Sequence, residues 1–196
     1  MKLSEVLDSI SETSIKFKTS TPYICGGVVR DKLLNRLNKI NDLDITTGDK
    51  TIHLLGQEFY NSIYKKYNVT SETAKDNHFT IAMGNLKIDF SSNFIYPNID
   101  QLLGTNTYNS LELETYSRDY TCNSLLSDLK LSKILDLTKR GERDVNSKII
   151  DTCLSPEHTL SIQPNRAFRA VYLAVKLLFN ISPRVIKWLK SNSIIV

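Results

Sequence analysis

Gly26-Gly27-Val28-Val29-Arg30-Asp31, followed eleven residues later by Asp42-Leu43-Asp44-Ile45, is the stretch of sequence that decides the fold. Pro22 to Cys25, just before the glycine pair, predicts a short buried strand. Val28 to Leu37 predicts a helix whose apolar face consists of Val29, Leu33, Leu34 and Leu37. The glycine pair therefore lies between a strand and a helix.

The glycine pair and the helix after it form a candidate phosphate site. Gly26 and Gly27 place no side chain between their backbone N–H groups and an incoming phosphate. The start of a helix adds partial positive charge, and Arg30 adds a planar fork of donors for phosphate oxygens. No Lys-Ser/Thr follows a second glycine, and no Gly-x-Gly-x-x-Gly spacing occurs, which disfavours the P-loop and dinucleotide-binding classes.

The two aspartates form a candidate metal site. On a strand, Leu43 and Ile45 face one side and Asp42 and Asp44 project from the other. Two carboxylates on one face repel each other unless a cation lies between them, and Mg²⁺ prefers such oxygen ligands. In nucleotidyl transfer, two such ions hold the attacking hydroxyl and the leaving pyrophosphate. Taken without the glycine motif, such a pair is more often the solvated face of an edge strand.

Asp89 is the candidate third carboxylate. Thr80 to Met83 and Leu86 to Phe90 predict a hairpin about a Gly84-Asn85 turn. Ile88 and Phe90 would face the core, and Asp89 the opposite side. The sequence therefore predicts catalytic carboxylates at Asp42, Asp44 and Asp89.

These residues carry a family resemblance. Gly-Gly-x-Val-Arg-Asp followed by Asp-x-Asp resembles the head domain of the tRNA nucleotidyltransferase (CCA-adding enzyme) and bacterial poly(A) polymerase family, in the polymerase β superfamily. Three further segments are similar to family motifs: 117–125, 134–144 and 164–170. The resemblance implies an α/β (α+β) nucleotidyltransferase head with a small mixed or antiparallel sheet over residues 1–140, and a short helical neck over 141–196.

The resemblance also implies roles for individual residues. Asp42 and Asp44 would hold Mg²⁺, and the nucleotide would contact Gly26, Gly27, Arg30, Arg118, Asp119, Asn123, Gln163, Arg166 and Arg169. Arg30, Arg118 and Arg169 match triphosphate ligands, and Asp119 and Asn123 would lie beside the sugar and phosphates. Ser117 and Tyr172 stand where the family usually has arginine.

The base-reading motif departs from the family form. The family has Glu-Asp-x-x-Arg, whose Asp and Arg read the base of the incoming nucleotide, whereas this chain has Ile162, Gln163 and Arg166. An aspartate only accepts hydrogen bonds, whereas Gln163 both donates and accepts, so the set of readable bases changes. We expect a Gln163→Asp substitution to shift nucleotide choice toward CTP and ATP.

The function implied is template-independent transfer of NMP from ATP or CTP to an RNA 3′ end, with tRNA as the expected acceptor. Two alternatives stay open: the same core acting on another acceptor, as in a tRNA-modifying toxin or antiviral enzyme, or a module that binds nucleotide or RNA without turnover. Family members continue into further helical domains, whereas this chain ends at an apolar Ser193-Ile194-Ile195-Val196. This ending predicts a partner subunit, a homodimer contact or a truncated form.

The helix expected after Pro164 has two predicted stripes. The apolar stripe comprises Phe168, Val171, Val175, Leu178 and Phe179, and the polar one Arg166, Arg169, Tyr172 and Lys176. Elsewhere the patterns predict helices at Leu3 to Ile10, Thr51 to Tyr64 and Ile99 to Leu103, a strand at Tyr67 to Glu72, and a last helix from Ser182-Pro183.

Composition is compatible with this assignment. The 196 residues are 41% hydrophobic and 23% charged, with a net charge of +4. Residues 139–196 hold 10 Lys/Arg against 4 Asp/Glu, which favours polyanion binding at that end. Three separated cysteines disfavour a disulfide framework or a zinc site, and no apolar run is long enough to span a membrane. We expect a cytoplasmic protein without membrane contact.

Overall fold

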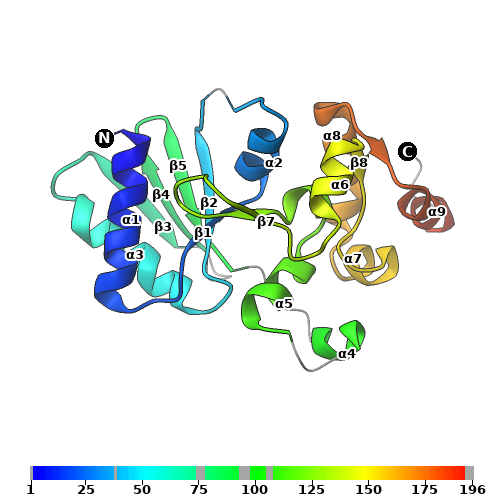
Figure 1. Cartoon of the computed structure of the whole chain (residues 1–196), viewed down its shortest axis with the longest axis horizontal. Helices are drawn as coiled ribbons and strands as arrows, with labels where there is room; N and C mark the ends of the chain where they lie inside the picture. The colour runs from blue at the N-terminus through cyan, green and yellow to red at the C-terminus, as the bar shows by residue number, and fades with distance from the viewer. Residues whose placement is uncertain (1, 38, 74–77, 93–97, 105–107, 193–196) are drawn as a thin grey trace.

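The computed structural model describes residues 2–37, 39–73, 78–92, 98–104 and 108–192. Its centre is a seven-stranded mixed sheet in the order β3-β4-β5-β2-β1-β6-β7 (Figure 1). The strands are β1 (Tyr23–Cys25), β2 (Asp42–Thr46), β3 (Val69–Thr73), β4 (Phe79–Met83), β5 (Leu86–Phe90), β6 (Leu126–Ser127) and β7 (Ile134–Leu135). The predicted α/β class and mixed sheet are confirmed.

The aspartate strand β2 lies in the middle of this sheet. It pairs antiparallel with β1, where Asp44 lies opposite Cys25, and parallel with β5, where Asp44 lies opposite Asp89. Leu43 and Ile45 are fully buried, while Asp42 is exposed and Asp44 partly buried. The predicted two-faced strand is therefore confirmed.

Two helices cover one face of the sheet: α1 (Leu3–Phe17) and α3 (Thr51–Ile63) (Figure 1). Both bury an apolar stripe, with Val6 and Ile10 on α1 and Leu55 and Phe59 on α3. A Cβ on Gly56 would lie 3.0 Å from ring atoms of Phe79 and Phe90, so α3 packs closely because this position has no side chain. The helix predicted at Leu3 to Ile10 continues to Phe17, where Lys18 ends it in a left-handed conformation.

Helix α2 (Gly27–Leu33) is shorter than the predicted span to Leu37. The chain turns at Leu34 and at Asn35, which has φ 53°. Asn35 tolerates this left-handed conformation better than most residues, which explains the early end. Helix α4 (Ile99–Leu103) matches its prediction, and the predicted strand at Tyr67 to Glu72 is β3, displaced by one or two residues.

Residues 141–192, which follow the last strand of the sheet, are mainly helical and lie at the end of the molecule away from α1 and α3 (Figure 1). One continuous core cluster includes buried residues from both sides of residue 140, so the domain boundary placed there stays a prediction. The remaining elements are α5 (Ser110–Ser117), a 3₁₀ turn η1 (Thr121–Asn123), α6 (Gly141–Asn146), β8 (Ile149–Ile150), α7 (Pro156–Ile162), α8 (Asn165–Leu177), β9 (Asn180–Ile181) and α9 (Pro183–Ser191).

The apolar stripe predicted for α8 does not form its buried face, although Phe179, just beyond the helix, is buried. The helix buries small and leucine side chains, Ala167, Ala170, Leu173 and Leu177. Phe168, Val175 and Leu178 are exposed by 68%, 71% and 81%. Helix α8 carries two apolar stripes on different faces, and the stripe with the smaller side chains lets it approach the protein more closely.

The predicted last helix is confirmed as α9, where the Ser182 side chain accepts from the Val185 N–H and Pro183 occupies the first turn. Residues 193–196, the apolar ending, lie outside the described residues. Within the part of the chain that the structure describes, no helix has the length and apolar character needed to span a membrane.

Candidate active site

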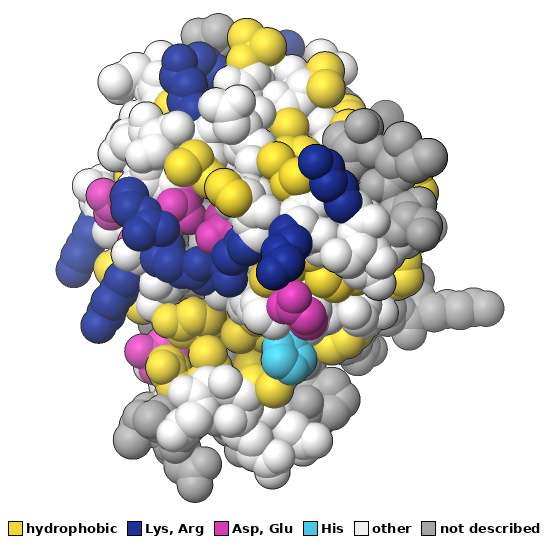
Figure 2. Space-filling view, turned by 90° about the vertical axis from the view of Figure 1, so that its right-hand side faces the viewer, with side chains coloured by type: hydrophobic (Ala, Val, Ile, Leu, Met, Phe, Trp, Pro, Cys, Tyr) yellow, Lys and Arg dark blue, Asp and Glu magenta, His cyan; other side chains and the backbone are white. Residues whose placement is uncertain are grey.

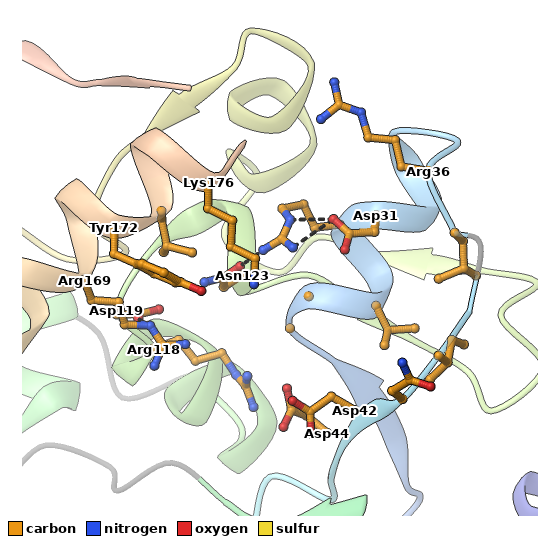
Figure 3. A pocket seen from close by; sticks show the side chains of 18 of the residues that line it. Asp31, Arg36, Asp42, Asp44, Arg118, Asp119, Asn123, Arg169, Tyr172 and Lys176 are labelled. Atoms are coloured by element: carbon orange, nitrogen blue, oxygen red, sulfur yellow. Dashed lines mark hydrogen bonds and ion pairs between the residues drawn. The ribbon is translucent and has the colours of Figure 1, made fainter. Parts of the chain in front are cut away.

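A pocket of about 700 Å³ lies between α2, β2 and the first turns of α8 (Figure 3). Its lining includes most of the predicted site residues: Gly26, Gly27, Arg30, Asp42, Asp44, Arg118, Asp119, Asn123, Gln163, Arg166 and Arg169. These residues come from positions up to 143 apart in the chain, and the fold brings them together. The one predicted site residue outside this lining is Asp89.

Asp42 and Asp44 form the acidic side of the pocket. They lie next to each other on β2, and the Arg118 guanidinium points toward them (Figure 3). Burial raises the pKa of Asp44, the Arg118 charge opposes this shift, and the nearby Asp89 and Asp42 carboxylates add to it. A carboxylate that is both desolvated and crowded by like charge favours a bound cation.

Gly26 is held against this carboxylate. It has φ 73°, a conformation that residues with a side chain rarely adopt, and a Cβ built there would lie 2.8 Å from the Asp44 Oδ2. The glycine pair therefore brings backbone directly next to the acidic side of the pocket. The predicted contact of its N–H groups with phosphate stays a prediction.

Asp89 lies beside Asp44 in the parallel register but has partners of its own. Its Oδ1 accepts from the Thr80 hydroxyl at 2.5 Å, and its Oδ2 pairs with the Lys87 ammonium at 2.6 Å. Among the described residues, no group of three His, Cys, Asp or Glu side chains could hold a metal ion. The third metal ligand thus stays a prediction, and Asp42 and Asp44 remain the candidate pair.

Arg30 lines the pocket but is buried, and each of its three side-chain nitrogens already contacts a partner. Its Nε and Nη2 contact the Asp31 carboxylate at 2.9 and 2.8 Å, and its Nη1 donates to Asn123 Oδ1 at 2.7 Å. Asn123 and Arg30 therefore bind each other, and both line the pocket. Asp31 was not predicted as a site residue, although its place next to Arg30 in the sequence offered a signal.

Arg118 is likewise held by buried side chains. Its Nη2 contacts the buried Glu114 at 2.6 Å and the Cys25 Sγ at 3.2 Å. Burial raises the pKa of the Cys25 thiol to about 12, so this thiol stays protonated. Glu114 was missed by the sequence analysis; its four-residue spacing from Arg118 on a helix was the available signal.

Helix α8 and the turn before it form the opposite wall. The Arg169 Nε pairs with Asp119 Oδ2 at 2.8 Å, which links α8 to the segment before η1. Arg166 is buried, donating from Nε to Gln163 Oε1 at 2.8 Å and from Nη2 to the Ser117 carbonyl at 3.1 Å. All four residues of the predicted polar stripe of α8 line the pocket. Arg166 is buried, whereas Arg169, Tyr172 and Lys176 are exposed to solvent.

Additional cations surround the opening. Arg36, Lys39 and Lys176 line the pocket and are exposed. Figure 2 shows Lys and Arg side chains gathered in a band across the end of the molecule formed by the C-terminal half. Such charge attracts polyanions, and its strength depends on ionic strength.

The donor set suits a divalent metal. Asp42 and Asp44 supply hard carboxylate oxygens on one strand, with cations and glycine N–H groups nearby for phosphate. When bound, such an ion would neutralise phosphate charge and polarise the reacting oxygens. These features make the pocket the candidate site for a metal ion and a nucleotide, on a nucleotidyltransferase-like sheet.

Comparison with known proteins identifies the family. Residues 22–151 match the model of the poly A polymerase head domain, and the chain belongs to that family. It is 28% identical over 204 residues to the tRNA nucleotidyltransferase cca2 of Schizosaccharomyces pombe, covering 94% of this chain and 41% of that protein. It is 27% identical over 172 residues to poly(A) polymerase I of Salmonella typhimurium, covering 82% of this chain and 35% of that protein.

Solved structures agree on the fold. A tRNA nucleotidyltransferase complexed with a primer tRNA and an incoming ATP analogue has a TM-score of 0.69 at 24% identity, covering 93% of this chain and 49% of that one. The chain thus spans less than half the length of the relatives it matches. These relatives are nucleotidyltransferases, a class that generally uses a divalent metal.

Proposed function

We propose that this chain carries the catalytic site of a template-independent RNA nucleotidyltransferase, which transfers NMP from an NTP to an RNA 3′ end. The observation that carries the proposal is the placement of Asp42 and Asp44 on one side of a pocket whose other surfaces hold glycine N–H groups and cations. The tRNA 3′ end is the proposed acceptor, because the relatives include tRNA nucleotidyltransferases.

The proposed reaction is an in-line displacement at the α-phosphorus. The RNA 3′ oxygen forms the new bond to phosphorus, the bond to the bridging oxygen of the β-phosphate breaks, and pyrophosphate leaves. Asp42 and Asp44 would hold Mg²⁺, which would supply charge neutralisation to the attacking and leaving oxygens. Gly26 and Gly27 would offer N–H groups to the triphosphate, and Arg118 a positive charge beside it.

A direct test is extension of tRNA transcripts that end before the CCA sequence, with each labelled NTP and Mg²⁺. Structures of relatives include complexes with CTP and with an ATP analogue, so these two nucleotides are the reference substrates. An unstructured oligonucleotide serves as the second acceptor. Labelling of only non-RNA acceptors would favour the alternative acceptor class, and tight nucleotide binding without transfer under Mg²⁺ or Mn²⁺ would favour a binding module.

The matched variants are Asp44→Asn, which removes one carboxylate charge from the pocket, and Asp8→Asn, which removes one from the exposed surface of α1. We expect Asp44→Asn to lower incorporation by roughly 1,000-fold or more, within the range that electrostatic groups at phosphoryl-transfer sites contribute. Asp8→Asn should leave incorporation unchanged. Full activity of Asp44→Asn would refute the assignment. A homodimer or partner subunit, and the cytoplasmic location, stay predictions.

A further inference from the structure

The face of the sheet that carries the acidic pair continues from β2 onto β5. Helices α1 and α3 cover the opposite face, where Ile88 of β5 is fully buried (Figure 1). In the parallel register of β2 and β5, Lys87 lies opposite Asp42. Asp89 lies opposite Asp44 in the same register. Partners in register project to the same side of a sheet, so Lys87 and Asp89 share the face of the acidic pair.

Lys87 places a positive charge on this face. Its side chain is 52% exposed, and its ammonium contacts the Asp89 Oδ2 at 2.6 Å. The Asp89 Oδ1 accepts from the Thr80 hydroxyl, which holds the carboxylate in place. An ammonium has three N–H donors, and one of them has a partner among the residues that the structure describes. Within the described chain, two donors are therefore open to a ligand.

This charge is separate from the cations of the pocket. Strands β2, β3, β4 and β5, as the structure describes them, contain no other lysine or arginine. The pocket cations lie on other elements, including α2 and α8, and Lys87 is not part of that lining. Lys87 therefore forms a second positively charged position beside the acidic pair.

The order of the strands gives the two sides of the acidic pair different neighbours. On one side of β2 lies β1, which ends at Cys25 and leads into the glycine turn, and on the other side lies β5. In the proposed in-line displacement, the attacking and leaving oxygens lie on opposite sides of the α-phosphorus. With the pyrophosphate at the glycine turn, the attacking 3′ oxygen arrives from the β5 side. The acceptor strand then passes over the open face of β5, where Lys87 lies.

We propose that Lys87 binds the acceptor RNA by contacting the backbone phosphate on the 5′ side of its terminal nucleotide. Phosphate is a strong hydrogen-bond acceptor for an ammonium and carries the opposite charge. This inference rests on the proposed function, because it takes the direction of attack from the in-line transfer. It names the class of acceptor that the site fits, which is a polynucleotide with such a phosphate rather than a small alcohol.

The test combines one change in the protein with one in the RNA. Lys87→Met removes the ammonium but keeps an unbranched apolar side chain. A methylphosphonate at the last internucleotide linkage removes the negative charge of that phosphate. The nucleotide before this linkage is 2′-O-methylated in both the charged and the neutral oligonucleotide, because a free 2′-hydroxyl would cleave a neutral linkage. Transfer is measured at low ionic strength, where a contact between exposed charges is least screened.

For the wild-type chain, the neutral linkage should raise the acceptor KM by about five- to tenfold, because a charge-assisted contact is lost. Lys87→Met should raise the KM of the charged acceptor by about the same factor, and the neutral linkage should then add little. The KM for the NTP should be the same in both proteins. Lys87→Met should also lower the slope of log KM against log salt by about 0.7, the value for one phosphate contact on a single strand.

Lys16→Met is the matched control, because Lys16 is exposed on α1, on the covered side of the sheet. It should behave like the wild-type chain with both oligonucleotides. Equilibrium binding of the same oligonucleotides without NTP, read by fluorescence anisotropy in Ca²⁺, gives a second readout and should show the same pattern.

Equal effects of the neutral linkage on the wild-type chain and on Lys87→Met would overturn the inference, as would an unchanged acceptor KM in Lys87→Met. A raised KM for the NTP in Lys87→Met would also overturn it, because Lys87 would then act through the metal or nucleotide site. These outcomes leave the proposed transfer standing. If no acceptor is extended at all, the proposed function fails, and the binding measurements still decide whether Lys87 contacts the phosphate.

Discussion

The Gly26→Ala substitution tests whether the glycine turn positions the catalytic carboxylate. A Cβ at this position would lie 2.8 Å from the Asp44 Oδ2, whereas carbon and other heavy atoms make favourable contacts at roughly 3.5 Å. The carboxylate or the turn must therefore move by roughly half an ångström or more. A misplacement of about 1 Å at a reacting centre can cost roughly 100-fold in rate, so we expect a loss of about 10- to 100-fold in nucleotide incorporation.

The same substitution has a separate backbone cost. Gly26 has φ 73°, so an alanine there should lower the free energy of unfolding by about 1–3 kcal/mol. Gly84→Ala is the matched control, because Gly84 has φ 58° in the β4–β5 turn and a Cβ there would meet nothing within 4 Å. It should lower the free energy of unfolding by about 1–2 kcal/mol and leave incorporation unchanged.

The assays are urea unfolding and single-nucleotide extension of a tRNA transcript, both on the same preparations. If Gly26→Ala and Gly84→Ala lose similar stability and both retain wild-type incorporation, then the contact between the turn and Asp44 has no catalytic importance. If both lose activity, general destabilisation explains the loss and the positioning argument fails.

Two other outcomes are expected. Burial raises the pKa of Asp44, so the folded chain binds this proton more tightly than the unfolded chain, and metal-free wild type should lose stability relative to Asp44→Asn as the pH rises above about 4. Urea unfolding of both proteins in EDTA at pH 4 and pH 7 measures this change. The same stability difference between wild type and Asp44→Asn at both pH values would contradict it. Leu173→Ala should lower the free energy of unfolding by about 2–5 kcal/mol, whereas Phe168→Ser should change it by less than about 0.5 kcal/mol; equal losses would show that the exposed stripe of α8 is packed in solution.

Short-range patterns predicted the sheet well. The alternation in β2 gave the correct buried and exposed faces, and the Gly84-Asn85 turn correctly predicted the β4–β5 hairpin. These features depend on neighbours in the sequence, where side-chain periodicity is informative. The buried face of helix α8 was predicted wrongly because the helix has two apolar stripes. Only its neighbours in the folded structure determine which stripe is buried.

In the site too, local motifs could be predicted from the sequence, whereas long-range contacts could not. The glycine pair and the aspartates could be identified from local motifs, and the fold places them together. The contacts of Arg118 with Cys25 and of Arg166 with the Ser117 carbonyl could not, because these groups are far apart in the sequence and meet only in the folded chain.

The pairing of β1 with β6 has a consequence for how the chain folds. Cys25 lies opposite Leu126, so the strand before the glycine turn finds this neighbour only after about 100 intervening residues have been ordered or looped out. The opposite wall of the pocket comes from still later residues, in α8. During synthesis the pocket would therefore be completed only after the residues of α8 have emerged from the ribosome. A nucleotide would stabilise a nascent chain that includes α8 and have little effect on fragments that end before it.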